Sequence, residues 1–319
     1  MLEQSRSGDA NAEISAVLAS TVESEEDAKY ELHRTKRLGI GGWLAAIWLV
    51  FIVLYAFIVP LITKNQHHGD IANQGFLKDL GNPLGGDSIG QSLTVELAEA
   101  TRNSLLVGIG AIGIGLIVGG SFGLIAGYLR GGIDKVLSTI FNIFLAIPQL
   151  ILAVAIVAAL ASNHLDKFSQ TVPPSWERRF VCLIVALGLV SIPILGRITR
   201  ANSLQWSQRE FVMAARAQGA NKFRVMVREV LPNVMPAMFS IALLGIAVAI
   251  VAEGALSILG AGVAEGKSLG GIIALGQSDM RNNPHIVFEP VAIIFFTVLS
   301  LNYLGDIIRA RFDVRESVL

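Results

Sequence analysis

The stretch EFVMAARAQGANKFRVMVREVLP, residues Glu210–Pro232, lies between two long apolar runs and is the most informative part of the chain. Its first half contains mostly good helix formers, and Gly219 follows at a point where a helix C-terminus favours a left-handed glycine. Asn221 can cap a second helix, and Pro232 suits the first turn of the apolar run that follows. The pattern predicts two short helices, joined at an angle, that lie across one face of a membrane protein.

The charge and the apolar pattern of this loop leave two interpretations open. Residues 197–228 carry seven lysines and arginines, and the second predicted helix has an apolar stripe formed by Phe223, Val227 and Val230. An amphipathic hairpin of this kind can lie on anionic lipid. So many charged, helix-forming residues on one loop of a hydrophobic protein also indicate a docking site for a soluble partner.

The composition is that of a membrane protein. Of the 319 residues, 53% are hydrophobic and only 16% are charged, against about 25% charged residues in soluble domains. The formal net charge is zero, so no overall field attracts nucleic acid. A single cysteine, Cys182, excludes an intrachain disulfide and a cysteine-built zinc site. Residues 1–38 hold eight acids and predict a flexible tail ahead of a membrane domain at 39–315.

Six uncharged apolar runs are candidates for membrane-spanning helices, each of which needs about 20 residues to cross the hydrocarbon. They are residues 40–62, 103–129, 136–163, 180–196, 230–252 and 290–305. With the N-terminus in the cytoplasm, the inner segments hold 17 of the 25 lysines and arginines, and the outer loops hold 8. Because cytoplasmic loops carry the excess of basic residues, both termini and the loop at 197–232 are predicted to be cytoplasmic.

Three features inside the spans bear on packing and gating. One face of the second span has a glycine every four residues, at Gly115, Gly119, Gly123 and Gly127. This stripe predicts close helix packing, with a substrate path as the alternative. Pro148 indicates a bend in the third span. Glu253 predicts either a polar contact in a pore or gate, or a residue near the outer interface that stays wet.

The loop resembles the cytoplasmic EAA loop of ATP-binding-cassette (ABC) importer permeases. Ala214-Ala215, Gly219 and Leu231-Pro232 stand at that family's spacing. Met213 replaces the family's glutamate and Glu229 replaces its isoleucine, so the electrostatics of docking differ from the pattern. The resemblance implies an ATPase-coupling loop formed by Glu210, Phe211, Ala214, Ala215, Arg216, Gly219, Arg224, Leu231 and Pro232.

Further segments, in order between residues 40 and 315, resemble the dipeptide and oligopeptide branch of the same family. They are Pro83–Asp87 with Gly90, Gly127-Tyr128 with Asp134, Leu145–Pro148, Glu253 with Leu256–Gly260, and Asn302–Asp306 with Arg309. Gln91-Ser92 replaces the customary Arg-Asp after the first of them. The resemblance implies an all-α integral membrane protein with six transmembrane helices and the type I ABC importer permease fold.

This resemblance also implies a function and a set of partners. The chain is expected to move di- or oligopeptides across the prokaryotic cytoplasmic (inner) membrane by alternating access, with nickel chelates or glutathione as alternative substrates. Expected partners are a second homologous permease, two ABC ATPase subunits or domains, an external substrate-binding protein and membrane lipid, without nucleic acid. No catalytic residue, metal or cofactor is expected in this chain, because ATP and magnesium belong to the partner ATPases.

Other classes of function fit the sequence less well. The segment Gly260–Ser268 suggests a phosphate loop, but Ala261 occupies the place of that motif's first glycine. An ion-gradient-driven carrier calls for inverted repeats and midplane ligands, of which the spans offer only Glu253. An intramembrane enzyme lacks a nucleophile–base pair in the spans. All five histidines fall in predicted tails or loops, at His33, His67, His68, His164 and His285.

Overall fold

The computed structural model describes residues 39–63, 84–86, 91–161, 164–165, 171–172, 175–263 and 266–316. Nearly all of them are helical, which confirms the all-α prediction. Two two-residue strands, β1 (His164–Leu165) and β2 (Thr171–Val172), pair antiparallel in one connection between helices. The predicted tail at 1–38 and the motif residues Pro83, Asp87 and Gly90 lie outside the described residues.

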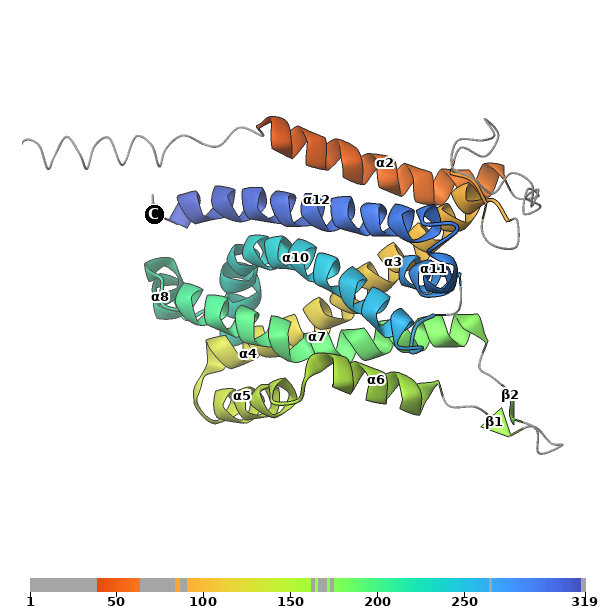
Figure 1. The fold of residues 1–319 in the computed structure, drawn as a ribbon. Helices are drawn as coiled ribbons and strands as arrows, with labels where there is room; N and C mark the ends of the chain where they lie inside the picture. Colours follow the sequence, from red (N-terminus) through yellow and green to blue (C-terminus); the bar gives the residue numbers. More distant parts are fainter. Residues whose placement is uncertain are drawn as a thin grey trace, which may run out of the picture.

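Long helices account for most of the described chain (Figure 1). In order, the helices are α2 (Ile40–Ile62), α3 (Leu93–Ile114), η2 (Gly115–Gly119), α4 (Gly120–Leu129), α5 (Gly131–Leu145), α6 (Gln149–Leu160), α7 (Trp176–Trp206), α8 (Glu210–Ala217), α9 (Lys222–Val225), η3 (Met226–Val230), α10 (Leu231–Ile258), α11 (Leu269–Gly276), η4 (Gln277–Asp279) and α12 (His285–Glu316). His285, predicted in a loop, therefore begins a helix.

The described residues contain five helical segments that are long and apolar enough to cross a membrane, or six if a bent pair counts as one span. The bent pair is α5 and α6, which meet at 88° where a single third span was predicted. The break lies at Pro148, whose ψ of 123° is not helical, and a proline also disfavours helix at the residue before it. The predicted bend at Pro148 is confirmed. The short fourth run at 180–196 grows to the 31 residues of α7, because charged residues at both ends join the helix.

The glycine stripe, Gly115, Gly119, Gly123 and Gly127, packs η2 and α4 against α7. A Cβ atom added at Gly119 or Gly123 would overlap a backbone carbonyl oxygen of α7, that of Ile192 or of Gly196. At Gly127, the added Cβ would lie 2.5 Å from the carbonyl oxygen of Arg200. Such close backbone approach is how helices associate where lipid gives no hydrophobic drive. The packing interpretation of these glycines is confirmed.

The two ends of the bundle differ in what they carry. Figure 1 places α8 at the same end as the start of α2 and the end of α12, and α11 near the other end with β1 and β2. At the α11 end, α3, α11 and α12 share a core that includes Leu93, Leu97 and Ile272. Along the bundle, α12 packs against α2 and α10, and α7 against α3, α4 and α6. The α8 end therefore carries the loop that the sequence singles out.

Candidate coupling element

The first helix of the loop ends as its sequence predicts. The Gly219 N–H donates to the carbonyl of Arg216 at 3.0 Å, and the Ala220 N–H donates to that of Ala215 at 3.2 Å. This pair of bonds is the Schellman arrangement, which needs a left-handed residue after the helix, and Gly219 has φ +84°. Ala215 and Ala220 also pack against one cluster of buried side chains. The turn is therefore fixed by backbone geometry that favours glycine.

The second helix begins as predicted but does not end as a separate element. The Asn221 side chain accepts a hydrogen bond from the Phe223 N–H at 3.2 Å and caps α9. After one turn, α9 passes through the π-helical turn η3 directly into α10. Pro232 lies in the first turn of α10, as predicted. The prediction of two short helices is therefore correct for α8, whereas the second helix is the first part of a 37-residue helical segment, Lys222–Ile258.

The loop is fastened to the bundle by a face that the sequence analysis did not find. Buried side chains of the loop pack against Leu124 and Tyr128 of α4 and Trp206 of α7. Those of the loop are Val212, Val225, Met226 and Val230. The predicted stripe was wrong for two of its members, because Phe223 is 68% exposed and Val227 is also exposed.

The π turn explains this error, since an extra residue in one turn rotates the faces before and after it. A signal was present in the sequence. Met226, Val230, Val234 and Met238 recur every four residues and are all buried in the same cluster.

Two arginines lie over aromatic rings where the loop meets the bundle. The Arg216 guanidinium is 4.8 Å from the centre of the Tyr128 ring, and that of Arg209 is 5.4 Å from the Trp206 ring. Trp206 also contacts Phe211, with ring centres 6.2 Å apart. Such cation–π contacts are attractive and add orientation to the apolar packing. They connect the loop to the last turns of α4 and α7.

The predicted coupling residues lie mostly on the outer face of the loop. Ala215 and Leu231 are half-buried. The exposed ones are Glu210, Phe211, Ala214, Arg216, Gly219, Arg224 and Pro232. We call residues 210–230 the α8–η3 element: one face is buried on α4 and α7, and the opposite face is open and combines charged and polar side chains with exposed apolar ones such as Met213 and Phe223.

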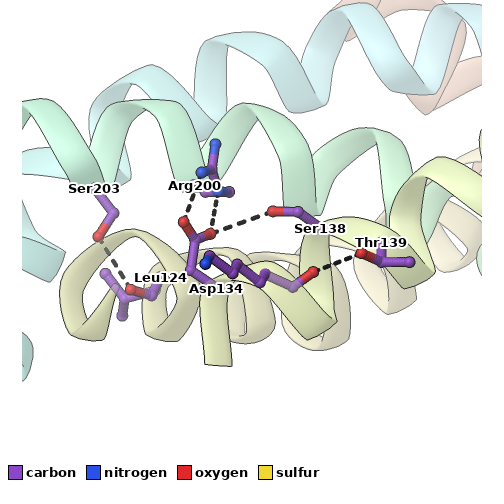
Figure 2. A network of polar contacts seen from close by, with 7 residues as sticks. Leu124, Asp134, Ser138, Thr139, Arg200 and Ser203 are labelled. Atoms are coloured by element: carbon purple, nitrogen blue, oxygen red, sulfur yellow. Dashed lines mark hydrogen bonds and ion pairs between the residues drawn. The ribbon is translucent and has the colours of Figure 1, made fainter. Parts of the chain in front are cut away.

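Polar contacts next to this element join α5 to α7 (Figure 2). The Arg200 guanidinium makes two parallel hydrogen bonds to the Asp134 carboxylate, from Nε to Oδ1 and from Nη2 to Oδ2, the second at 2.7 Å. Ser138 donates to the same carboxylate at 3.2 Å. Arg130, between α4 and α5, donates to the Ser207 hydroxyl at 3.0 Å. In the sequence, Asp134 belongs to one of the family-like motifs, but nothing there indicates its pairing with Arg200.

Glu253 lies away from this element, near the α11 end of α10. Its side chain is fully buried and accepts hydrogen bonds from Ser104 of α3 at 2.9 Å and Ser257 at 2.8 Å. The Ser257 and Ser268 hydroxyls are 3.3 Å apart, and Ser268 caps α11. Because Glu253 is sealed from solvent, the interpretation of a wet interfacial residue was wrong for this conformation. The carboxylate instead joins three helices through hydroxyl groups.

The described residues contain no group of three or more His, Cys, Asp or Glu side chains that could hold a metal ion. The segment Gly260–Ser268, which suggested a phosphate loop, has another local role. The Ser268 hydroxyl accepts a hydrogen bond from the Gly271 N–H at 3.1 Å. Ser268 thereby begins the eight-residue helix α11.

Comparison with known proteins identifies the class. The family described as "Binding-protein-dependent transport system inner membrane component" matches residues 119–318. A dipeptide transport system permease protein, DppC of Alkalihalophilus pseudofirmus, is 32% identical over 275 residues, 85% of each chain. The glutathione transport system permease protein GsiD of Pectobacterium atrosepticum is 29% identical over 280 residues, 87% of each chain.

The fold has a counterpart among solved structures. A chain of the MetNI methionine ABC transporter, in an inward-facing conformation, has a TM-score of 0.52 and 19% identity to this one. The alignment covers 67% of this chain and 95% of that chain. This likeness concerns the fold alone, and it agrees with the type I permease fold expected from the sequence.

The chain belongs to the family of binding-protein-dependent transport system inner membrane components. It is the permease subunit of an ABC importer, and the ATPase activity lies in partner subunits. Membership places it in the inner membrane and gives it ATPase and substrate-binding-protein partners. The expectation of an ABC importer permease is thereby confirmed.

Proposed function

We propose that this permease subunit moves di- or oligopeptides across the membrane by alternating access. Support comes from relatives named for dipeptide and glutathione transport, which match most of this chain. Glutathione is itself a small peptide, so it is the second candidate substrate. The bundle would switch between outward and inward access as nucleotide in the partner ATPases biases its two states.

The observation that carries the coupling role is the division of the α8–η3 element into two faces. One face is buried on the ends of α4 and α7, and the opposite face is exposed although it lies on a hydrophobic protein. An element attached in this way can transmit a displacement caused by a soluble partner to α4 and α7 at the same time. The residues that would meet the ATPases are Glu210, Phe211, Ala214, Ala215, Arg216, Gly219, Arg224, Leu231 and Pro232.

The proposed assembly has a second homologous permease, two ABC ATPase subunits or domains that bind ATP and magnesium, and an external substrate-binding protein. The proposed topology has both termini and residues 197–232 in the cytoplasm, with residues 1–38 as a flexible tail and 39–315 as the permease domain. Two observations support it. The basic residues favour this orientation, and the start of α2, the end of α12 and α8 share one end of the bundle (Figure 1).

We also propose that Glu253 is a gate contact. Its bonds to Ser104 of α3 and Ser257 of α10 close a polar cluster that includes Ser268 at the start of α11. A movement that separates α10 from α3 at this level has to break the Ser104 bond. A buried acid held in this way favours the conformation in which the three helices are together.

Transport by the whole importer tests the proposed substrate class. The permease is purified with the proteins that accompany it and reconstituted in liposomes, and uptake of labelled dialanine, glutathione and a nickel chelate is compared with and without ATP. We expect ATP-dependent uptake of dialanine, with glutathione as the second substrate. Uptake of the nickel chelate alone, or uptake that follows an ion gradient without ATP, contradicts the proposal.

A further inference from the structure

In the bent pair α5–α6, α6 packs on α7 through Ala153 and Val157 in a buried cluster, whereas α5 is attached to the bundle at few points. Phe141 is the one buried residue of α5, and it fills the space over Gly196 of α7, where an added Cβ would lie 2.6 Å from the Phe141 ring. The other strong contact is the ion pair between Asp134 and Arg200. Both contacts follow helical spacing: Asp134 and Phe141 are two turns apart on α5, and Gly196 and Arg200 are one turn apart on α7. The orientation of α5 on α7 is therefore set by two points.

The ion pair between Asp134 and Arg200 is suited to holding α5 in a fixed position on α7. Both side chains are partly exposed, with 31% of the Arg200 side chain and 18% of the Asp134 side chain accessible, so its contribution to folding stability is small. Its two parallel hydrogen bonds nevertheless fix distance and angle, which a single point charge does not do. Figure 2 shows Arg200 extending from α7 to Asp134, with Ser138 on the other side of the carboxylate.

The connection from α4 to α5 is also held to α7. Arg130 has φ 57° and ψ −167° and is followed by Gly131 at φ 69°. This conformation is costly for a non-glycine residue and persists where surrounding contacts hold it. One such contact is the bond from Arg130 to Ser207, at the end of α7. The start of α5 therefore lies between two contacts to the last turns of α7.

These contacts lie directly beside the α8–η3 element. The element rests on Tyr128 at the end of α4 and on Trp206 at the end of α7. The turn at Arg130 follows Tyr128 by two residues, and Arg200 precedes Trp206 by less than two helical turns. A displacement of the element thus reaches α4 and α7 first, and α5 through the contacts at its start.

We propose that the Asp134–Arg200 ion pair is the joint through which α5 follows α7 when the ATPases move the α8–η3 element. Asp134 and Arg200 are positioning residues in this role and touch neither substrate nor nucleotide. The inference rests on the proposed function, since it assumes that the element receives the force. Loss of the pair would leave Phe141 as the main attachment of α5, so ATP would be hydrolysed with less movement of substrate.

The test uses the whole importer in liposomes and measures dialanine transported per ATP hydrolysed. Asp134→Asn and Arg200→Gln each remove one charge, and the double variant Asp134→Arg with Arg200→Asp restores a reversed pair. Thr139→Ala is the matched control, because the Thr139 hydroxyl bonds only to the Lys135 carbonyl of its own helix in the contacts described (Figure 2). Arg200→Lys keeps the charge without the parallel bonds and serves if the other single variants fail to insert.

We expect each charge-removing variant to lower the transport ratio by about fivefold or more, the range typical of coupling between sites. The reversed pair should recover most of that loss, Arg200→Lys should be intermediate, and Thr139→Ala should equal the wild type. The ATPases should still co-purify with every variant. An unchanged ratio in the charge-removing variants, or a reversed pair no better than either of them, overturns the joint. Loss of ATPase binding in these variants also overturns it, because the pair would then maintain docking. If the wild type takes up neither dialanine nor glutathione with ATP, the proposed function itself fails; if it takes up glutathione alone, the same ratio is measured with glutathione.

Discussion

At the scale of single residues, the glycines of the second span have a steric role. Gly123 faces the backbone of α7 so closely that an added Cβ would overlap the carbonyl oxygen of Gly196. Gly113 lies on the same long helical segment, and an added Cβ there meets nothing within 4 Å. The two positions therefore separate the effect of close packing from the general preference of a helix for alanine over glycine.

Gly123→Ala should lower the free energy of unfolding by about 1–3 kcal/mol, the usual cost of overpacking a close interface. Gly113→Ala should leave it unchanged or raise it by up to about 1 kcal/mol, since alanine favours helix. Thermal unfolding of the two variants in the same detergent measures both. Equal melting temperatures for the two variants would contradict the packing assigned to the stripe.

The buried position of Glu253 leads to a second prediction about stability and transport. Glu253→Ala removes the acceptor for Ser104 and Ser257 and should cost about 1–3 kcal/mol, because buried hydroxyls lose their partner. Glu253→Gln keeps an accepting oxygen and should cost less. If Glu253 is a gate contact, the glutamine variant also transports several-fold less dialanine at temperatures far below its unfolding. Wild-type transport in a stable Glu253→Gln importer would leave the residue with a packing role alone.

At the scale of elements, local signals in the sequence predicted the turn of the α8–η3 element well. Gly219, Asn221 and Pro232 each act through the backbone of their immediate neighbours, so their roles follow from residue type and position. The buried face was not found in this way, because it depends on packing against α4, which is distant in sequence, and against the end of α7. Val212 is buried through that packing, whereas Phe223 is equally apolar and remains exposed.

Gly219→Val tests whether this element docks to the ATPases. At φ +84° nothing lies within 4 Å of an added Cβ, so the substitution acts through the backbone, where a left-handed non-glycine residue costs about 1–2 kcal/mol. We expect about tenfold weaker binding of the ATPases, since about 1.4 kcal/mol corresponds to a factor of ten. Membrane insertion should be retained.

Gly132→Val is the matched control for that substitution. Gly132 is exposed at the start of α5, also has open space around an added Cβ, and lacks a positive φ. The Gly132→Val variant should bind the ATPases as tightly as the wild type does. Equal ATPase binding by the Gly219 and Gly132 variants would argue against the α8–η3 element as the docking site.

At the scale of the whole molecule, the lengths of the apolar runs predicted where the helical segments lie. They did not predict where those segments bend or how far they extend beyond the apolar runs. The first span was predicted at its observed bounds, 40–62, because it has no charge and touches the bundle on one side. The third span divides at Pro148, and the fifth begins eight residues earlier than its apolar run, at Lys222. The difference in the fifth span arises at the α8 end, where helix geometry and packing outweigh hydropathy.

The exposed face of α8 tests both the orientation of the chain in the membrane and its assembly with the ATPases. Met213 lies on that face with 53% of its surface accessible. In a chain with Cys182→Ala as the only background change, Met213→Cys is compared with Leu61→Cys, near the end of α2, where the side chain is 73% exposed.

A short bifunctional cross-linker is then applied to membranes that contain the whole importer. The account predicts that position 213 cross-links to an ATPase subunit and is modified by a membrane-impermeant thiol reagent only from the cytoplasmic side, while position 61 cross-links to no ATPase. Modification of position 213 from outside the cell, or the absence of any ATPase cross-link there, would contradict it.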